Sequence, residues 1–167
     1  MDDDRATVAR QLGRPPRAFR RVAVRCPFGR PAVTEQSPYD DAGEPFPTTY
    51  YLTCPQLVAA VSRLEAAGGV ERFGKLASSD PALRESLERA TARQRALRRS
   101  LANGRSGEDE GASLGLGIGG SSSLERLKCL HAHVAFALAE ESYELGEAIL
   151  SELKPLWPPV CCMDRRA

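Results

Sequence analysis

The first third of the chain shows the period of two that is typical of β-strands. Residues 19–24 alternate loosely between apolar and polar side chains, and residues 32–34 form a second short run. Residues 48–53 (TTYYLT) give the clearest strand, because β-branched and aromatic side chains favour extended backbone. Segments rich in Pro and Gly separate these runs, so we expect a small antiparallel sheet.

Helical spacing of apolar residues dominates the remainder. It predicts a helix from Pro55 to the glycine pair 68–69, one over about 81–101, one starting near Ser122 or Ser123, and one over about 143–153. The helix starting at Pro81 is the best defined, because Asp80 suits an N-cap. The third helix is apolar on nearly every face, as expected of a buried one. The predicted fold class is α+β: three to four helices, one of them central and buried, on a small antiparallel sheet.

A length of 167 residues with 42% hydrophobic and 27% charged residues fits one ordinary globular domain. We expect residues 1–17 to form a basic arm or short helix and residues 18–160 to form the single globular domain. Residues 105–116, rich in Gly, Ser and acids, are expected to be a flexible loop within it. Residues 161–167 are expected to be a tail.

Charge is unevenly distributed along the chain, although the formal net charge is only +1. Residues 5–30 contain eight arginines and no acid, whereas residues 108–152 contain nine acids and two basic residues. A nucleic-acid-binding role is one interpretation of the arginines. A protein partner, or the acidic half of the chain itself, would satisfy the same charges, and we favour a protein partner over nucleic acid.

The long helix expected over about 81–101 adds further arginines around an apolar stripe. A stripe of this kind has to pack on the domain core or on a partner helix. We therefore expect Leu87 and Leu97 to be buried, and Arg93 and Arg99 to be exposed.

We expect the protein to be cytoplasmic. Met1 is followed by three aspartates, where a secretory signal would carry positive charge. The five cysteines are an odd number without a disulfide-type spacing, so we expect reduced thiols. No membrane span is expected, because the longest apolar stretch, about 129–139, is far shorter than the ~20 residues that a spanning helix needs.

Thiols and imidazoles are concentrated in three short segments of the chain. These candidate metal ligands are Cys26, Cys54, Cys129, His131 and His133. Thiolate and imidazole are the ligands that zinc prefers, and an iron–sulfur centre would also use the thiols. Cys129 and His133 are four residues apart, so they would share a face of a helix. We expect Cys26, Cys54, Cys129 and one histidine, His133 before His131, to converge on a metal ion. Cys161 and Cys162 are reserve ligands.

Two other functions fit the same residues. A thiol- or metal-dependent enzyme would place its pocket between the segments CPFGRP, TCP and KCLHAH, with Cys54 activated at the start of the Pro55 helix and a histidine as its base. A nucleic-acid-binding accessory protein would use the arginine-rich faces. The interpretation we prefer is a metal-binding accessory or interaction protein, and whether it is an enzyme stays open.

The strings RCPFGRPAVTEQSP, EPFPTTYYLTCPQLVAAVSRLEAAGGV, GIGGSSSLERLKCLHAHVAFALA and YELGEAIL resemble a bacterial family catalogued as domain of unknown function 501, particularly its actinobacterial members. The resemblance covers roughly residues 18–160. It implies no activity. It implies a gene context beside a septum-formation initiator, an enolase and an exopolyphosphatase-like protein, and hence a housekeeping or division-linked partner.

Overall fold

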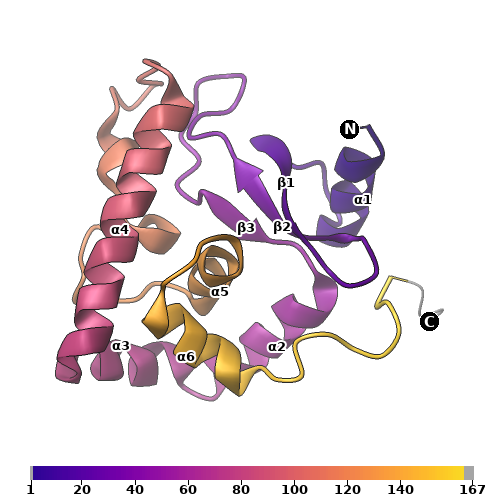
Figure 1. Ribbon diagram of the computed structural model, residues 1–167. Coiled ribbons are helices and arrows are strands. Elements are labelled where there is room, and N and C mark those ends of the chain that lie inside the picture. The colour runs from indigo at the N-terminus through magenta and orange to yellow at the C-terminus, as the bar shows by residue number, and fades with distance from the viewer. Residues whose placement is uncertain (1, 164–167) are drawn as a thin grey trace.

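The computed structural model describes residues 2–163 (Figure 1). This part of the chain contains three strands, six α-helices and two short 3₁₀ segments, joined by loops. In chain order the elements are α1 (Asp2–Leu12), β1 (Phe19–Arg25), β2 (Pro31–Gln36), β3 (Tyr50–Leu52), α2 (Pro55–Ala66), α3 (Gly69–Ser79), α4 (Pro81–Ala102), η1 (Ala112–Gly115), η2 (Ile118–Gly120), α5 (Leu130–Ala139) and α6 (Glu144–Glu152). The α+β class is confirmed. The number of helices is corrected, from three or four to six in the described part.

The strands form one antiparallel sheet in the order β1-β2-β3. Arg25 at the end of β1 pairs with Pro31, and Leu52 at the end of β3 pairs with Val33. The carboxyl ends of β1 and β3 therefore lie on either side of the start of β2. Helix α1 packs against β1 and β2, and α5 packs against β3, so all six residues of β2 are buried (Figure 1).

Local capping signals set the ends of the long helix α4. The Asp80 carboxylate accepts the N–H groups of Ala82 and Leu83 at 2.9 and 3.3 Å, which satisfies free donors of the first turn. Asn103 ends the helix in the left-handed conformation, with φ 47°. The helix predicted over about 81–101 is confirmed. It could be predicted because both capping signals lie within a few residues of its ends.

The glycine pair 68–69 indicates the end of α2, and the sequence pattern does not predict that α3 starts at Gly69. Gly68, with φ 84°, follows α2 and is also the N-cap of α3. The positive φ that glycine adopts easily lets the chain turn and start a second helix at once. Phe73 and Ala77 form the buried stripe of α3.

Helix α5 begins at Leu130, whereas a start near Ser122 or Ser123 was expected. The Ser121 hydroxyl donates to the carbonyl oxygens of Ser123 and Arg126, at 2.7 and 3.0 Å. Side-chain bonds of this kind offer the backbone an alternative to helix. The segment before Leu130 is therefore a series of turns.

The prediction that the third helix is central and buried is confirmed for α5, which lies between the sheet, α2 and α6 (Figure 1). Residues Leu130, Ala132, His133, Val134, Ala135 and Phe136 are buried. The Phe136 ring meets Tyr50 of β3 and Tyr143 edge to face, with ring centres 5.8 and 5.6 Å apart. Such pairs join the sheet, α5 and α6 into one core.

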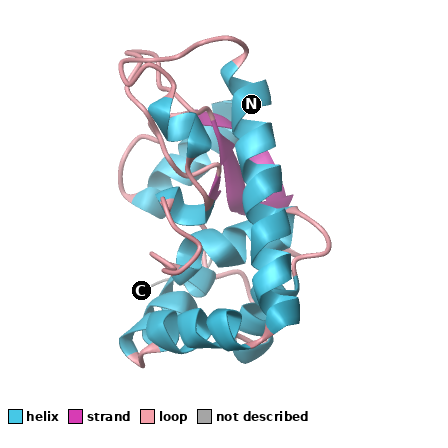
Figure 2. Ribbon diagram, turned by 90° about the vertical axis from the view of Figure 1, so that its left-hand side faces the viewer, coloured by secondary structure: helices cyan, strands magenta, loops and turns pink. Residues whose placement is uncertain are grey.

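Helix α4 runs along one side of the molecule, at the left in Figure 1 and facing the viewer in Figure 2. Leu87 is buried and both Arg93 and Arg99 are exposed, as expected, but Leu97 is only half-buried. The sequence pattern gave no sign that Arg98, beside exposed Arg99, is fully buried.

The segment 105–116 makes defined contacts with the rest of the molecule. Arg98 Nε donates to the carbonyl oxygen of Ser113 at 3.2 Å, and the Tyr39 hydroxyl donates to Asp109 at 2.9 Å. The flexibility expected of this segment stays a prediction. Met1 and residues 164–167, the ends of the predicted arm and tail, lie outside the described residues. No helix within 2–163 combines the length and the apolarity needed to cross a membrane.

Candidate metal centre

Cys26 and Cys54 follow the adjacent ends of β1 and β3. Cys26 forms a tight turn, in which its N–H donates to Arg30 O at 2.9 Å and Gly29 N–H donates to Cys26 O at 2.9 Å. Cys54 is the N-cap residue of α2, and its N–H donates to Ala32 O at 3.3 Å. Both thiols are buried. Because β1 and β3 run in the same direction on either side of β2, the prediction that these two strand ends lie together holds.

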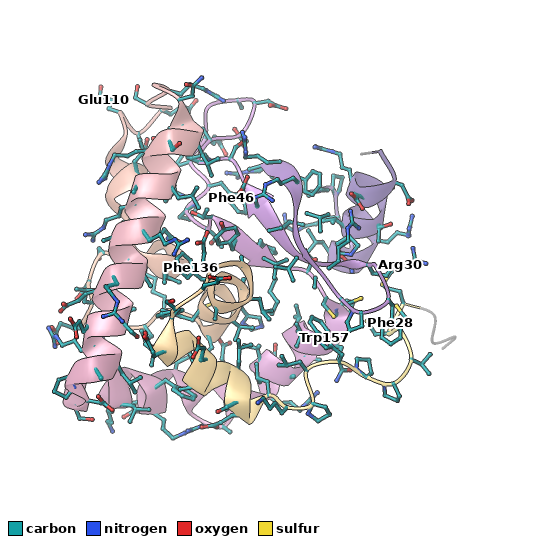
Figure 3. All side chains as sticks on the ribbon, in the orientation of Figure 1. Phe28, Arg30, Phe46, Glu110, Phe136 and Trp157 are labelled. Carbon is teal, nitrogen blue, oxygen red and sulfur yellow. The ribbon has the colours of Figure 1, made fainter. Side chains whose placement is uncertain are left out.

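The two thiols share a cavity with the cysteines of the C-terminal tail. Cys26, Cys54, Cys161 and Cys162 line one narrow cavity, with Phe28 and Trp157. Figure 3 shows Phe28 and Trp157 close together, with sulfur atoms beside them. We call these four cysteines the thiol cluster.

Within the thiol cluster, burial raises the pKa of Cys54 to about 11, and a hydrogen bond with Cys162 adds to this, although α2 backbone N–H groups oppose it. The Cys54 thiol is therefore protonated at neutral pH. This protonation removes the basis for Cys54 as an activated nucleophile, since the thiolate is the reactive form.

Cys129 lies in a second group, with His131 and Glu65. One ligand atom of each residue lies within 4.8 Å of the other two, and the described residues contain no other group of three or more Cys, His, Asp or Glu side chains as close as this. Cys129 is the N-cap residue of α5 and has extended backbone, with φ −161° and ψ 132°. It therefore precedes the helix, and the expected shared helical face with His133 is not formed.

Helix α2 holds the His131 ring on both sides. Glu65 Oε1 lies 3.2 Å from His131 Nδ1. His131 Nε2 lies 3.3 Å from Val58 O and 3.3 Å from the Ser62 hydroxyl. A hydrogen bond with the Cys129 thiol raises the pKa of His131, and the negative charge of Glu65 adds to this, whereas burial opposes it. The ring is thus oriented before any ligand binds.

His133 belongs to the protein core. It is 1% exposed, and its Nδ1 lies 2.6 Å from the Tyr143 hydroxyl. Burial lowers the pKa of His133 to about 4, so its ring is neutral at physiological pH. The structure does not bring His133 to Cys26, Cys54 or Cys129. The structure places His131, and not His133, in a group with Cys129.

The four expected metal ligands do not converge on one site. They are divided between two sites because α5 starts at Leu130 and not near Ser122 or Ser123. Cys26 and Cys54 meet the tail cysteines, whereas Cys129 and His131 meet Glu65 on α2. Sequence reasoning missed Glu65, since a search for Cys and His does not look for a carboxylate. The only local signal is weak: Glu65 is the single acid in α2.

The Cys129–His131–Glu65 group lies beside a cavity of about 590 Å³. Cys129 and His131 line this cavity, together with Thr53 and Pro55. The expected pocket between the TCP and KCLHAH segments is present, but no residue of CPFGRP lines it. A mixed set of sulfur, nitrogen and oxygen donors beside a cavity suits a metal ion with one open coordination position.

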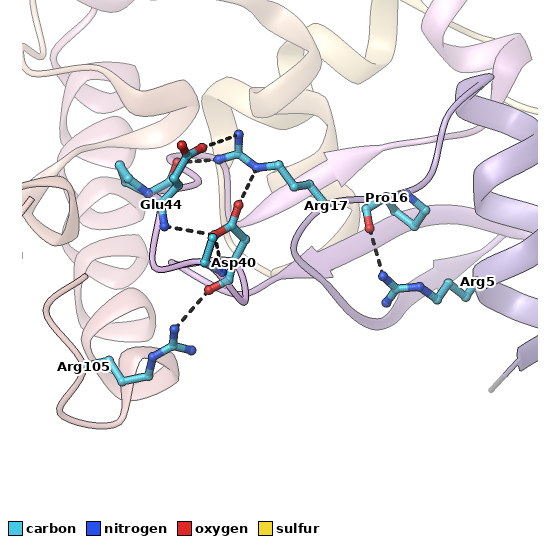
Figure 4. A network of polar contacts seen from close by, with 8 residues as sticks. Arg5, Pro16, Arg17, Asp40, Glu44 and Arg105 are labelled. Carbon is cyan, nitrogen blue, oxygen red and sulfur yellow. Dashed lines mark hydrogen bonds and ion pairs between the residues drawn. The ribbon is translucent and has the colours of Figure 1, made fainter. Parts of the chain in front are cut away.

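Several arginines of the arginine-rich faces pair with acids of this chain. Arg17 lies between Asp40 and Glu44, at 3.0 and 3.2 Å, as Figure 4 shows. Three arginines of α4 form ion pairs with acids that are distant in the sequence: Arg84–Glu125, Arg89–Glu144 and Arg93–Glu140. The acids of these three pairs belong to the acidic half of the chain, which was one of the expected partners for the arginines. No nucleic acid is needed to neutralise these side chains.

Comparison with known proteins gives a family and no activity. Residues 22–151 match a family model described as "Protein of unknown function (DUF501)". No curated protein and no solved structure matches the chain.

Proposed function

This chain belongs to the DUF501 family of proteins of unknown function, so its role has to be argued from its own site, and we propose that it binds a metal ion through Cys129, His131 and Glu65. Zinc is the ion that suits this donor set best. Iron–sulfur clusters take mainly thiolate ligands, whereas zinc accepts sulfur, nitrogen and oxygen together.

The observation that carries the proposal is the distance between the three donor atoms, all within 4.8 Å of one another. Around a tetrahedral zinc ion with bonds of ~2.0–2.3 Å, ligand atoms are about 3.3–3.8 Å apart. Side-chain rotations can close the remaining gap, because Cys129 and His131 are half-buried rather than locked in the core. Ion binding would require a deprotonated thiol and an unprotonated ring nitrogen, so it would release protons.

Three protein ligands beside a cavity are typical of a zinc site that keeps one position for water or a ligand. A closed structural site would need a fourth protein ligand. The proposed role is therefore metal-dependent binding of a further molecule. The arrangement suits an accessory protein or an enzyme equally well.

A second function is supported by the closeness of Cys129, His131 and Glu65, whose carboxylate lies 3.2 Å from His131 Nδ1. A thiol, an imidazole and a carboxylate are the side chains that together activate a cysteine nucleophile. The nucleophile in this alternative is Cys129, because the Cys54 thiol has a raised pKa.

The test measures metal content and affinity in protein purified without an affinity tag. We expect one zinc ion per chain, and a loss of at least about a hundredfold in affinity for Cys129→Ser, His131→Asn and Glu65→Gln. Cys162→Ser, which removes a thiol of the thiol cluster, is the matched control and is expected to keep full affinity.

Two results would contradict the proposal. Zinc affinity lost in Cys162→Ser and kept in Cys129→Ser would move the ion to the thiol cluster. Absence of zinc binding, together with a Cys129 thiol that alkylates rapidly at neutral pH and slows in His131→Asn, would favour the nucleophile.

We also propose that the protein is cytoplasmic, because a cysteine ligand stays reduced in that compartment. The proposal also keeps a division-linked protein partner, on the resemblance to the family alone. A nucleic-acid role is retained only as an alternative, tested by binding of a DNA duplex at two salt concentrations.

A further inference from the structure

The thiol cluster of Cys26, Cys54, Cys161 and Cys162 takes no part in the proposed zinc site. Its residues come from three distant parts of the chain: the turn after β1, the start of α2 and the tail after α6. The cavity that they line has a volume of about 10 Å³, which leaves room for about one water molecule. This cavity is too small for an organic ligand, so the chemistry of the cluster is that of the cysteines themselves.

The thiol cluster is not arranged as a metal site. Among the described residues, only Glu65, Cys129 and His131 bring three ligand atoms within 4.8 Å of one another. A tetrahedral zinc ion or an iron–sulfur cluster needs three or four such atoms. Reaction between two thiols needs only one close pair.

The tail carries its two cysteines into the cluster because it packs on the domain. Leu156, Trp157 and Cys162 lie partly buried against the hydrophobic core, and Cys161 is 3% exposed. Figure 3 shows Trp157 beside Phe28, which follows β1. The packing of this segment therefore determines which thiols of the tail meet Cys54.

Within the cluster, Cys54 and Cys162 interact with each other. The Cys162 thiol contributes to the raised pKa of Cys54, both by its charge and by a hydrogen bond. Cys54 is 3% exposed, whereas Cys162 is half-buried. A small oxidant from solvent therefore reaches Cys162 first, and Cys54 is the thiol placed behind it.

We propose that Cys54 and Cys162 form a reversible disulfide in the presence of hydrogen peroxide. The Cys162 sulfur attacks one peroxide oxygen, the O–O bond breaks, and Cys162 sulfenic acid and one water molecule form. The Cys54 sulfur then attacks the Cys162 sulfur, the S–O bond breaks, and a second water molecule leaves with the Cys54 proton. Two thiols are oxidised and one peroxide is reduced to two water molecules. The second step is intramolecular, so buried Cys54 needs no access from solvent.

The disulfide would join the tail to the start of α2. It would close a loop of about 100 residues, and this restricts the unfolded chain more than the folded one. In a reducing cytoplasm the pair rests as two thiols, and disulfides that form there are usually transient and redox-sensing. The inference goes beyond the proposed function, because neither cysteine is one of the proposed zinc ligands.

The test treats the full-length protein with hydrogen peroxide and maps its cross-linked peptides by fragmentation mass spectrometry, before and after dithiothreitol. We expect a cross-link between Cys54 and Cys162. We also expect the melting temperature to rise by at least about 5 °C on oxidation. Dithiothreitol should reverse both changes, since a disulfide is reducible and a sulfinic acid is not.

Two matched variants assign the pair. Combining Cys26→Ala with Cys161→Ala removes the other two thiols of the cluster, and this protein should still form the cross-link. Cys162→Ala should abolish both the cross-link and the rise in melting temperature. Cys161→Ala, at the neighbouring position of the tail, should keep both.

Three results would overturn the inference. The first is a cross-link that joins Cys26 or Cys161 in place of the expected pair. The second is oxidation of Cys162 to a sulfinic acid while Cys54 stays a thiol. The third is a peroxide-dependent rise in melting temperature that persists in Cys162→Ala.

Discussion

Glu65 accepts the backbone N–H of Leu130 at 2.6 Å, so a carboxylate in the last turn of α2 caps the first turn of α5 across 65 positions of sequence. Cys129, the N-cap residue of α5, makes no side-chain cap of its own. The same Glu65 oxygen lies 3.2 Å from His131 Nδ1. One carboxylate therefore both starts the central helix and orients the proposed metal ligand.

Glu65→Ala should destabilise the protein by about 1 kcal/mol, because it leaves donors in the first turn of α5 without a partner. Glu65→Gln keeps an oxygen acceptor for Leu130 N–H, so its free energy of unfolding should stay within about 0.5 kcal/mol of the wild type. Urea denaturation of metal-free protein measures both, with the exposed Glu141→Ala as control. Equal losses in the two Glu65 variants would show that the charge, not the cap, is what matters.

Arg98 is expected to be the most sensitive arginine of α4. Its guanidinium is fully buried and donates to Ser113 O at 3.2 Å and Phe46 O at 2.9 Å. Arg98→Met leaves both carbonyl oxygens without this donor, and it should lower the free energy of unfolding by about 2–4 kcal/mol. Arg99→Met, at the exposed neighbouring position, should change it by less than about 0.5 kcal/mol. Similar values for the two variants would mean that the buried guanidinium contributes nothing.

Gly107 tests whether the segment 105–116 is flexible. A Cβ added at Gly107, where φ is +60°, would lie 2.3 Å from the Tyr39 ring, whereas one added at Gly104, where φ is +81°, would meet open space. Both alanine variants pay the cost of a positive φ, about 1–2 kcal/mol. Gly107→Ala should therefore be the more destabilising, and the difference between their melting temperatures measures the packing. Equal melting temperatures would support the flexible loop.

The Cys54 thiol should react only at high pH. Because burial raises its pKa from 9.0 to about 11, its alkylation by iodoacetamide should keep increasing up to pH 10, as peptide mass spectrometry would measure. The folded state favours the neutral thiol, so this contribution to stability is full below pH 9 and is lost as pH rises toward 11. A labelling rate that is already constant by pH 8 would contradict the raised pKa and restore Cys54 as a nucleophile.

Elements that depend on signals a few residues apart could be predicted from the sequence. Asp80, Pro81 and Asn103 mark the ends of α4, and the run before Cys54 marks β3 followed by α2. The adjacency of Cys26 and Cys54 could also be inferred, because strand ends that meet in a small sheet place the following residues together. Caps, prolines and strand propensities act within one turn or one strand, so no distant contact was needed.

The candidate site depended on contacts between distant residues. The start of α5 is determined by Glu65 on another helix and by the turns that Ser121 stabilises, and no local pattern marks it. Because α5 starts seven or eight residues later than expected, Cys129 precedes the helix and lies with His131 and Glu65, while Cys26 and Cys54 share a cavity with the tail cysteines. Arg98 is buried and Arg99 exposed for the same reason. Helical periodicity gives a side chain's direction, whereas its burial and its partners depend on which distant segments pack against it.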